Sequence, residues 1–423
     1  MKLREQIFLY TLPLFPFWGY LFRVTVGMSF NFVVGFAVFF WTAILLAQKY
    51  GGGTGVRMPR YVLYYGLFTA YTIIVEIYVG KILEYNDESL LTYLTRHRHL
   101  VAFLFLVIIE NLTFDIKYLR RLLKLIVVVL MVASAVTVVQ VFDPYFFVYK
   151  NSKLLELMRT YYKGRLFSIY TWTSLNSVGF SFLSMLSIYY SINLLFKRDS
   201  RVLLVGAGVV SFLVQARWIM LNFLVIAFQK VLIDRKVLVS LAKYAVSLVF
   251  LLVIGYFMLP VLGVDIDAII EKRILNKSAF TRLLAFELFA NQFPKQPIFG
   301  TGGVKTAELM REIAGRSSQI HVGYLSLLYY YGIVGGTIYV LFLYEIMKRL
   351  RRVALKTNYW GTYFAFLAFL IANLTLVNLD LYEHGLLLTL TVHKFFERQA
   401  IEDAIKKEAA EEIEAPPAVP AYG

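Results

Sequence analysis

Cysteine is absent from the 423-residue chain. Disulfide bonds and thiolate metal sites are therefore excluded. Acidic residues are also scarce, because 27 aspartates and glutamates stand against 43 lysines and arginines, which gives a net charge of +16. No basic stretch is long enough, or interleaved with polar base-reading residues, to form a nucleic-acid interface. We therefore interpret the positive charge as an anchor that holds cytoplasmic loops at a membrane.

Several motifs that would define a function are missing as well. There is no phosphate-binding loop of the ATP or dinucleotide type, so neither a nucleotide sugar nor a nucleotide cofactor is indicated. The basic N-terminus is followed by an apolar stretch without a small-residue cleavage site, which argues against a cleavable signal peptide. No internal repeat of the kind found in many secondary transporters is present. The informative features are therefore the apolar stretches and the loops between them.

Hydrophobic residues make up 59% of the chain, whereas a soluble globular protein is close to half apolar. The excess falls into stretches of roughly 15 to 25 residues, the length of a helix that crosses a bilayer. We predict an all-α polytopic membrane protein with about twelve transmembrane helices, with boundaries good to a few residues. The predicted spans are 7–22, 28–47, 61–80, 99–114, 122–142, 176–196, 202–216, 218–233, 240–262, 320–345, 358–378 and 381–396.

The basic residues predict how this bundle is oriented in the membrane. When the N-terminus is placed in the cytoplasm, every short cytoplasmic loop carries lysine or arginine, as the positive-inside rule requires. Both termini are then cytoplasmic, and the three longer segments, 81–98, 143–175 and 263–319, lie outside. The last of these contains a helix-like run and a glycine-rich stretch, so we expect it to be ordered with short helices. Residues 1–399 form the membrane domain, and 400–423 are expected to be a disordered cytoplasmic tail.

Two isolated side chains on the outer side could carry chemistry. Arg217 interrupts an apolar hairpin at its outer end, where a cation either contacts an anionic group or snorkels to the headgroups. His321 opens the span 320–345 and has the side chain best suited to general base catalysis near neutral pH, unless it merely caps a helix. The other four histidines are expected at the interface without a chemical role. They are His97, His99, His384 and His393.

The outer loops add a second arginine and a glycine-rich run. Arg282 lies on the helix-like stretch of the third segment, and the run 296–303, with Gly300 and Gly302, follows it. Small residues there let backbone N–H groups approach an anion, although the same pattern also forms a simple tight turn. In the second segment, Arg165 precedes Trp172 and Asn176, and such exposed aromatic and polar groups suit either a sugar face or a membrane interface.

The three arginines and His321 therefore reach one face from separate parts of the chain. Arginine suits bidentate contact with phosphate oxygens. No cluster of carboxylates accompanies these residues, which argues against a divalent-metal site because such a site needs hard oxygen ligands. The sequence predicts an anion-binding site without metal.

At these residues the chain resembles the O-antigen polymerases and O-antigen ligases, which are membrane glycosyltransferases of the GT-C type. The clearest likeness is His321-Val322 followed, after nine residues, by Gly332-Ile333-Val334-Gly335. The ligase-type pattern has Asn, Ser or Gln where this chain has Val322. The remaining likenesses are Pro297 to Gly302 for the family's Pro-Leu-Phe-Gly-x-Gly turn, Arg282 with Phe286 in place of a frequent Trp, Ala216-Arg217 for Ser-Arg, and Arg165-Leu166 before Asn176. These motifs cover about 165–345, and outside that range the likeness rests on span count, topology and length.

The resemblance implies a GT-C-like fold and a donor glycan carried on undecaprenyl diphosphate at the outer face of the bacterial inner membrane. His321 would take the proton of the acceptor hydroxyl, while Arg217 and Arg282, with Arg165 as a third, would hold the diphosphate. Direct displacement would invert the anomeric carbon, and neither metal nor cofactor is implied. The implied substrate-binding residues are Arg165, Asn176, Gly300, Gly302 and Trp172.

Polymerase is favoured over ligase, because Val322 departs from the ligase pattern. The acceptor would be a glycan or a lipid-linked acceptor, which is lipid A-core in a ligase, and a chain-length regulator protein is a further expected partner. Two other classes stay open. A lipid-linked glycan flippase or transporter would show discontinuous helices and ionisable residues deep in the spans. A non-catalytic assembly protein would tolerate replacement of His321.

Overall fold

The computed structural model describes most of the chain, and the regular structure of that part is helical. The described residues are 3–15, 30–53, 55–78, 97–112, 115, 117–143, 146, 173, 176–214, 216–233, 277–302, 320, 322–374 and 384–414. Among these residues there is no strand, which confirms the all-α prediction for them. The predicted span 240–262 lies outside the described residues.

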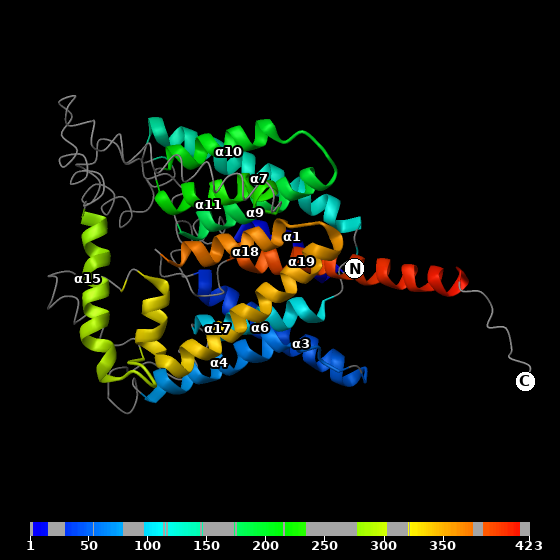
Figure 1. The fold of residues 1–423 in the computed structure, drawn as a ribbon. Helices are drawn as coiled ribbons and strands as arrows, with labels where there is room; N and C mark the ends of the chain where they lie inside the picture. The colour runs from blue at the N-terminus through cyan, green and yellow to red at the C-terminus, as the bar shows by residue number, and fades with distance from the viewer. Residues whose placement is uncertain are drawn as a thin grey trace, which may run out of the picture.

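The helices form a bundle with α15 across one end and α19 leaving from the other (Figure 1). Most of them overlap the predicted spans. In chain order they are α1 (Leu3–Thr11), η1 (Leu12–Leu14), α3 (Phe30–Gly51), α4 (Arg60–Ile77), α6 (Arg98–Asn111), α7 (Lys117–Phe142), α9 (Asn176–Leu195), α10 (Arg201–Leu213), α11 (Arg217–Ala227), α12 (Gln229–Ile233), α15 (Lys277–Gln292), η5 (Phe293–Lys295), α17 (Gly323–Thr357), α18 (Gly361–Ala372) and α19 (His384–Glu414).

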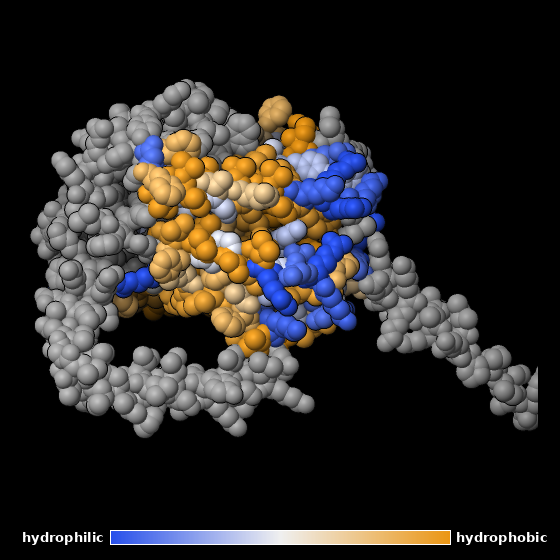
Figure 2. Space-filling view, turned by 90° about the horizontal axis from the view of Figure 1, so that it is seen from above, coloured by the Kyte–Doolittle hydropathy of each residue, from blue (hydrophilic) through white to orange (hydrophobic). Residues whose placement is uncertain are grey.

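Several helices have the length and composition to cross a membrane. Among the described residues, α7, Val178–Leu195 of α9, and α17 are both long and apolar enough, and α10, α11 and α18 are shorter apolar helices. Large apolar side chains on α7, such as Val128 and Met131, are exposed, and a soluble protein rarely presents such a continuous apolar face. Figure 2 shows apolar residues over much of the visible face and hydrophilic residues gathered at one end. The molecule is thus suited to a membrane.

Aromatic packing holds α4 against α17. The rings of Tyr65 and Phe342 lie 4.7 Å apart between centroids, and those of Phe68 and Tyr339 lie 4.9 Å apart. On α4, Tyr61, Tyr65 and Phe68 recur at helical spacing and are all buried, so one stripe of the helix faces the core. Tilted and edge-to-face ring pairs of this kind add stability beyond the burial of their area.

A buried group of charges joins α4, α6, α17 and α19. The Arg349 guanidinium donates to both carboxylate oxygens of Glu110, at 2.9 and 3.2 Å, and to both oxygens of Glu397, at 3.0 and 2.6 Å. Lys394 donates to a carboxylate oxygen of Glu110 at 3.3 Å, and the Tyr61 hydroxyl donates to the other at 2.5 Å. Because a buried carboxylate is costly without such partners, Glu110 depends on all three.

We expect Arg349→Lys to destabilise the protein by about 2 kcal/mol, because lysine keeps the charge but cannot span two carboxylates with a planar fork. Thermal unfolding in detergent measures the effect. Arg352→Lys is the matched control, since Arg352 lies on the same helix with an exposed side chain. Equal melting temperatures for the two variants would show that the fork contributes nothing to stability.

Helix α19 extends further than the sequence predicts. It continues to Glu414, into the segment 400–423 for which we expected a disordered tail. The physical reason lies in the composition of 401–414, which is rich in alanine, glutamate and lysine, all strong helix formers. The described part of the chain therefore ends in a helix that leaves the bundle (Figure 1).

Candidate functional site

Helix α17 is broken at Gly332. This residue has φ 63° and ψ −169°, outside the helical region, and divides the helix into a short piece, 323–331, and a longer one. We call residues 323–331 the half-helix. A break leaves the carbonyl groups before it and the N–H groups after it without intrahelical partners. In a membrane those groups need other partners.

The N–H groups after the break bond to the segment 297–302, which we call the turn. The Ile333 N–H donates to the Pro297 carbonyl at 2.8 Å, and the Val334 N–H donates to the Ile298 carbonyl at 3.2 Å. The first free donors of the longer piece of α17 are thereby satisfied. The turn comes directly after α15 and η5, so the segment that follows these helices supplies what α17 lacks.

The carbonyl groups before the break bond to the other side of the same turn. The Thr301 N–H donates to the Tyr329 carbonyl at 3.0 Å, and the Gly302 N–H donates to the Tyr330 carbonyl at 2.9 Å. The Gly300 N–H is also engaged. These donors are therefore used within the protein, and the expectation that Gly300 and Gly302 offer N–H groups to an anion is not supported by their hydrogen bonds.

Close backbone approach explains the glycines of the junction. Gly300 has φ 78° and Gly332 has φ 63°, both in the left-handed region that favours glycine. A Cβ on Gly300 would overlap the Tyr330 carbonyl, and one on Gly332 would overlap the Ile298 carbonyl. The two glycines thus face each other's backbone at the break.

A small apolar cluster packs α15 onto the half-helix. It consists of Ala285 and Leu288 from α15 together with Ile320 and Tyr329. Arg282 lies on α15 one turn before Ala285, but its side chain is outside the described part of the structure. His321 itself is also outside, although its neighbours Ile320 and Val322 are both buried. The structure therefore brings together the elements that carry Arg282, the turn and the neighbours of His321.

Arg217 begins α11 on a different part of the bundle. Its side chain is exposed, and the adjacent Trp218 stacks on Phe180 of α9 with ring centroids 6.3 Å apart. Phe180 in turn meets Phe369 of α18 edge-on at 5.5 Å. Asn176 is the first residue of that same α9, and nothing of its side chain is described. Arg217 and Asn176 therefore belong to helix ends that are packed together.

The end of α18 links this group to the half-helix. The Asn373 carbonyl, just beyond α18, accepts a hydrogen bond of 3.0 Å from the Gly323 N–H. The elements that carry Arg217 and Asn176 thus connect to the start of the half-helix through α18. The last two predicted site residues, Arg165 and Trp172, lie outside the described residues.

A polar cluster that sequence reasoning missed lies beside the break. The Tyr331 hydroxyl donates to Glu76 at 2.7 Å, and the other carboxylate oxygen of Glu76 lies 3.3 Å from His97 Nε2. His99 Nδ1 lies 3.0 Å from the Tyr65 hydroxyl. His97, His99 and His393 are buried within the protein. The signal that could have found this cluster is Glu76, a carboxylate within an apolar span.

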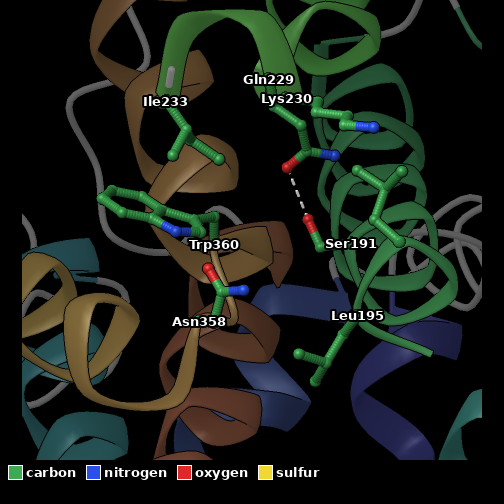
Figure 3. Close-up of a pocket in the computed structure, with 8 residues that line it drawn as sticks. Ser191, Leu195, Gln229, Lys230, Ile233, Asn358 and Trp360 are labelled. Atoms are coloured by element: carbon green, nitrogen blue, oxygen red, sulfur yellow. Dashed lines mark hydrogen bonds between the residues drawn. The ribbon is translucent and has the colours of Figure 1, made fainter. Parts of the chain in front are cut away.

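A cavity lies next to the C-terminal end of α17, at the other end of this helix from the half-helix, and Figure 3 shows the residues that line it. It measures about 190 Å³, and the Ser191 hydroxyl donates to the Gln229 amide oxygen within it at 2.5 Å. Asn358 and Trp360, which line it, follow the last turn of α17. Of the predicted site residues whose side chains the structure describes, none lines this cavity.

Neither known protein families nor curated proteins contain a match to this chain. Within the described ranges, no three histidine, aspartate or glutamate side chains come together as a metal ion would require. The candidate site is therefore defined by the junction of α15, the turn and the half-helix, with the end of α11 joined to it through α18.

Proposed function

We propose that the protein is a glycosyltransferase that polymerises O-antigen or a similar surface polysaccharide from a polyprenyl-diphosphate donor at the outer face of the inner membrane. The observation that carries this proposal is the apolar cluster of Ala285, Leu288, Ile320 and Tyr329. It packs the helix of Arg282 against the chain on either side of His321. Two residue types that the reaction needs, an anion-binding arginine and a base, thus belong to elements in contact.

The reaction consists of one displacement. The acceptor hydroxyl attacks the anomeric carbon, the bond from that carbon to the diphosphate oxygen breaks, and the diphosphate leaves with the electron pair. His321 takes the hydroxyl proton, while Arg282 and Arg217, with Arg165 as a third, stabilise the charge that develops on the diphosphate. The anomeric configuration is inverted, and neither metal nor cofactor takes part.

The proposed topology has about twelve spans with both termini in the cytoplasm. The hydrophilic residues gathered at one end of the apolar surface support it (Figure 2). In that arrangement α19 leaves on the cytoplasmic side, while α15 and the turn lie on the outer side (Figure 1). A lipid-linked glycan delivered to the outer leaflet would meet the junction there.

Val322 favours a polymerase over a ligase. It caps the half-helix in extended conformation and is buried, where the ligase pattern places a polar side chain. Deleting the gene and separating the surface glycan on a gel distinguishes the two activities. Single repeat units on the lipid carrier indicate a lost polymerase, whereas long chains retained on the carrier indicate a lost ligase.

Two observations favour a second candidate, a flippase or transporter for the lipid-linked glycan. The break in α17 makes a discontinuous helix, and Glu110 is a deeply buried carboxylate, both of which such proteins use. Against this candidate, the turn occupies backbone groups on both sides of the break, and Arg349 and Lys394 compensate Glu110. A transporter needs such groups to bind its substrate or coupling ion, and here they are bonded within the protein. We therefore favour the transferase over the transporter.

Purified protein in detergent should turn over a lipid-linked glycan donor, and the rate should be undiminished in EDTA. The reason is that arginines, rather than a metal held by oxygen ligands, neutralise the leaving diphosphate. Product formation is followed by chromatography of the released polyprenyl diphosphate. Activity that is lost in EDTA and restored by magnesium or manganese would contradict the arginine-based mechanism. Absence of any turnover would favour the transporter.

A further inference from the structure

The cluster around Glu76 has no role in the reaction as described so far. We propose that Tyr71 and Glu76 are positioning residues that hold the half-helix and the turn in a fixed place on α4. They thereby set the position of the outer unit, α15 with the turn and the half-helix, relative to Arg217 on the bundle. This inference rests on the proposed function, because it assigns a second set of residues to the same site.

Tyr71 is the first part of the argument. Its hydroxyl lies 3.0 Å from the Phe299 carbonyl and 2.9 Å from the Tyr331 carbonyl, so one group on α4 bonds both the turn and the half-helix. A phenol has a single hydrogen, which the two carbonyls share. The Tyr331 carbonyl is the last of the half-helix, so Tyr71 bonds the half-helix at the break itself.

Glu76 is the second part. One carboxylate oxygen accepts from the Tyr331 hydroxyl at 2.7 Å, and the other lies 3.3 Å from His97 Nε2. His97 Nδ1 accepts from the Leu100 N–H at 3.2 Å, so in the neutral ring the hydrogen is on Nε2, the nitrogen that lies near Glu76. Tyr331 is therefore held at its carbonyl by Tyr71 and at its hydroxyl by Glu76.

Other packing contacts hold each part of the molecule together, so the positioning role of Tyr71 differs from a contribution to overall stability. The apolar cluster containing Ala285 and Tyr329 joins α15 to the half-helix independently of Tyr71. The aromatic pair Tyr65 and Phe342 joins α4 to the longer piece of α17, also independently of Tyr71. Loss of the Tyr71 hydroxyl should therefore leave the outer unit and the bundle each intact, while the position of one on the other becomes less defined.

The expected kinetics follow from this less defined position of the outer unit on the bundle. In Tyr71→Phe, kcat should fall about tenfold, the effect of losing roughly one hydrogen bond's free energy at the reacting geometry. The KM for the donor should change little, and the shape of the pH–rate profile should stay the same, because His321 is retained. Glu76→Gln, which keeps an oxygen to accept from Tyr331, should be closer to the parent protein than Glu76→Ala.

A distance measurement tests the positioning without any assay of activity. Because the natural chain has no cysteine, Leu67→Cys on α4 and Phe286→Cys on α15 introduce two unique sites, both at exposed side chains. Spin labels on these sites report the distance between α4 and the outer unit by pulsed electron resonance in lipid nanodiscs. We expect one narrow distribution in the parent and a clearly broader or shifted one in Tyr71→Phe and in Tyr331→Phe.

Tyr78→Phe is the matched control, since Tyr78 ends α4 with an exposed side chain, and its distribution should equal that of the parent. Identical distributions in Tyr71→Phe, Tyr331→Phe and the parent would overturn the positioning role. A protein without transferase activity would remove the proposed function but leave this test intact. Conversely, an active enzyme with unchanged distances in the variants would remove only the positioning role.

Discussion

Gly332→Ala should destabilise the protein by roughly 4 kcal/mol and abolish activity at physiological temperature. The new methyl group would overlap the Ile298 carbonyl and approach the Gly300 N–H. The residue would also have to keep φ 63° and ψ −169°, a conformation that only glycine adopts without strain. Relieving either conflict moves the turn away from α17, which leaves buried backbone groups without partners.

The measurement is thermal unfolding in detergent, together with turnover of a lipid-linked donor below the melting temperature. Gly206→Ala provides the control, because Gly206 lies on α10 and a Cβ there meets nothing within 4 Å. In a helix interior, alanine is favoured over glycine by about 0.5–1 kcal/mol, so this control should be as stable as the parent or more so. A Gly332→Ala protein that melts with the parent would contradict the description of the junction.

Replacing His321 by alanine should lower turnover by about two to four orders of magnitude while donor binding is retained. The variant lacks the group that takes the acceptor proton, but the arginines that hold the diphosphate are unchanged. Arg282 should respond differently. Arg282→Lys keeps the charge without the planar fork and should be partly active, whereas Arg282→Ala should be nearly inactive.

The pH dependence supplies an independent check on His321. An imidazole with its ordinary pKa becomes protonated below about pH 6 and can then no longer accept a proton, so the wild-type rate should decline there. Single-turnover rates between about pH 5 and 8 measure this, with donor binding as the control at each pH. A rate that is flat over that range, or near wild-type turnover by His321→Ala, would assign proton removal to another group.

The helices could be predicted because their signal lies within each segment. The apolar stretch 122–142 becomes α7, which begins earlier, at Lys117, because lysine and arginine continue a helix readily. The stretch 358–378 becomes α18, from Gly361 to Ala372. Length and apolar composition decide both cases, and neither needs information about a distant partner.

The junction could not be predicted because its partners are distant in the chain and act through backbone atoms. The turn suggested an anion site since its glycines allow close approach, and the group that approaches is the backbone of α17. Nothing in the sequence around Gly332 specifies that the turn pairs with this helix. The contact of His97 was not predicted for the same reason. Its neighbours in the sequence are polar, while Glu76, whose carboxylate lies 3.3 Å from its Nε2, belongs to another helix.

The order of synthesis has a bearing on the break in α17. A chain emerges from the ribosome N-terminus first, and Tyr71 and the turn both precede Gly332. Every group that closes the break has therefore been made before the break itself is inserted. The Asn373 carbonyl that receives the Gly323 N–H comes later, so a nascent chain that stops after α17 already has a closed break before the half-helix gains its anchor on α18. A discontinuous helix can thus enter lipid without waiting for a segment still to be translated.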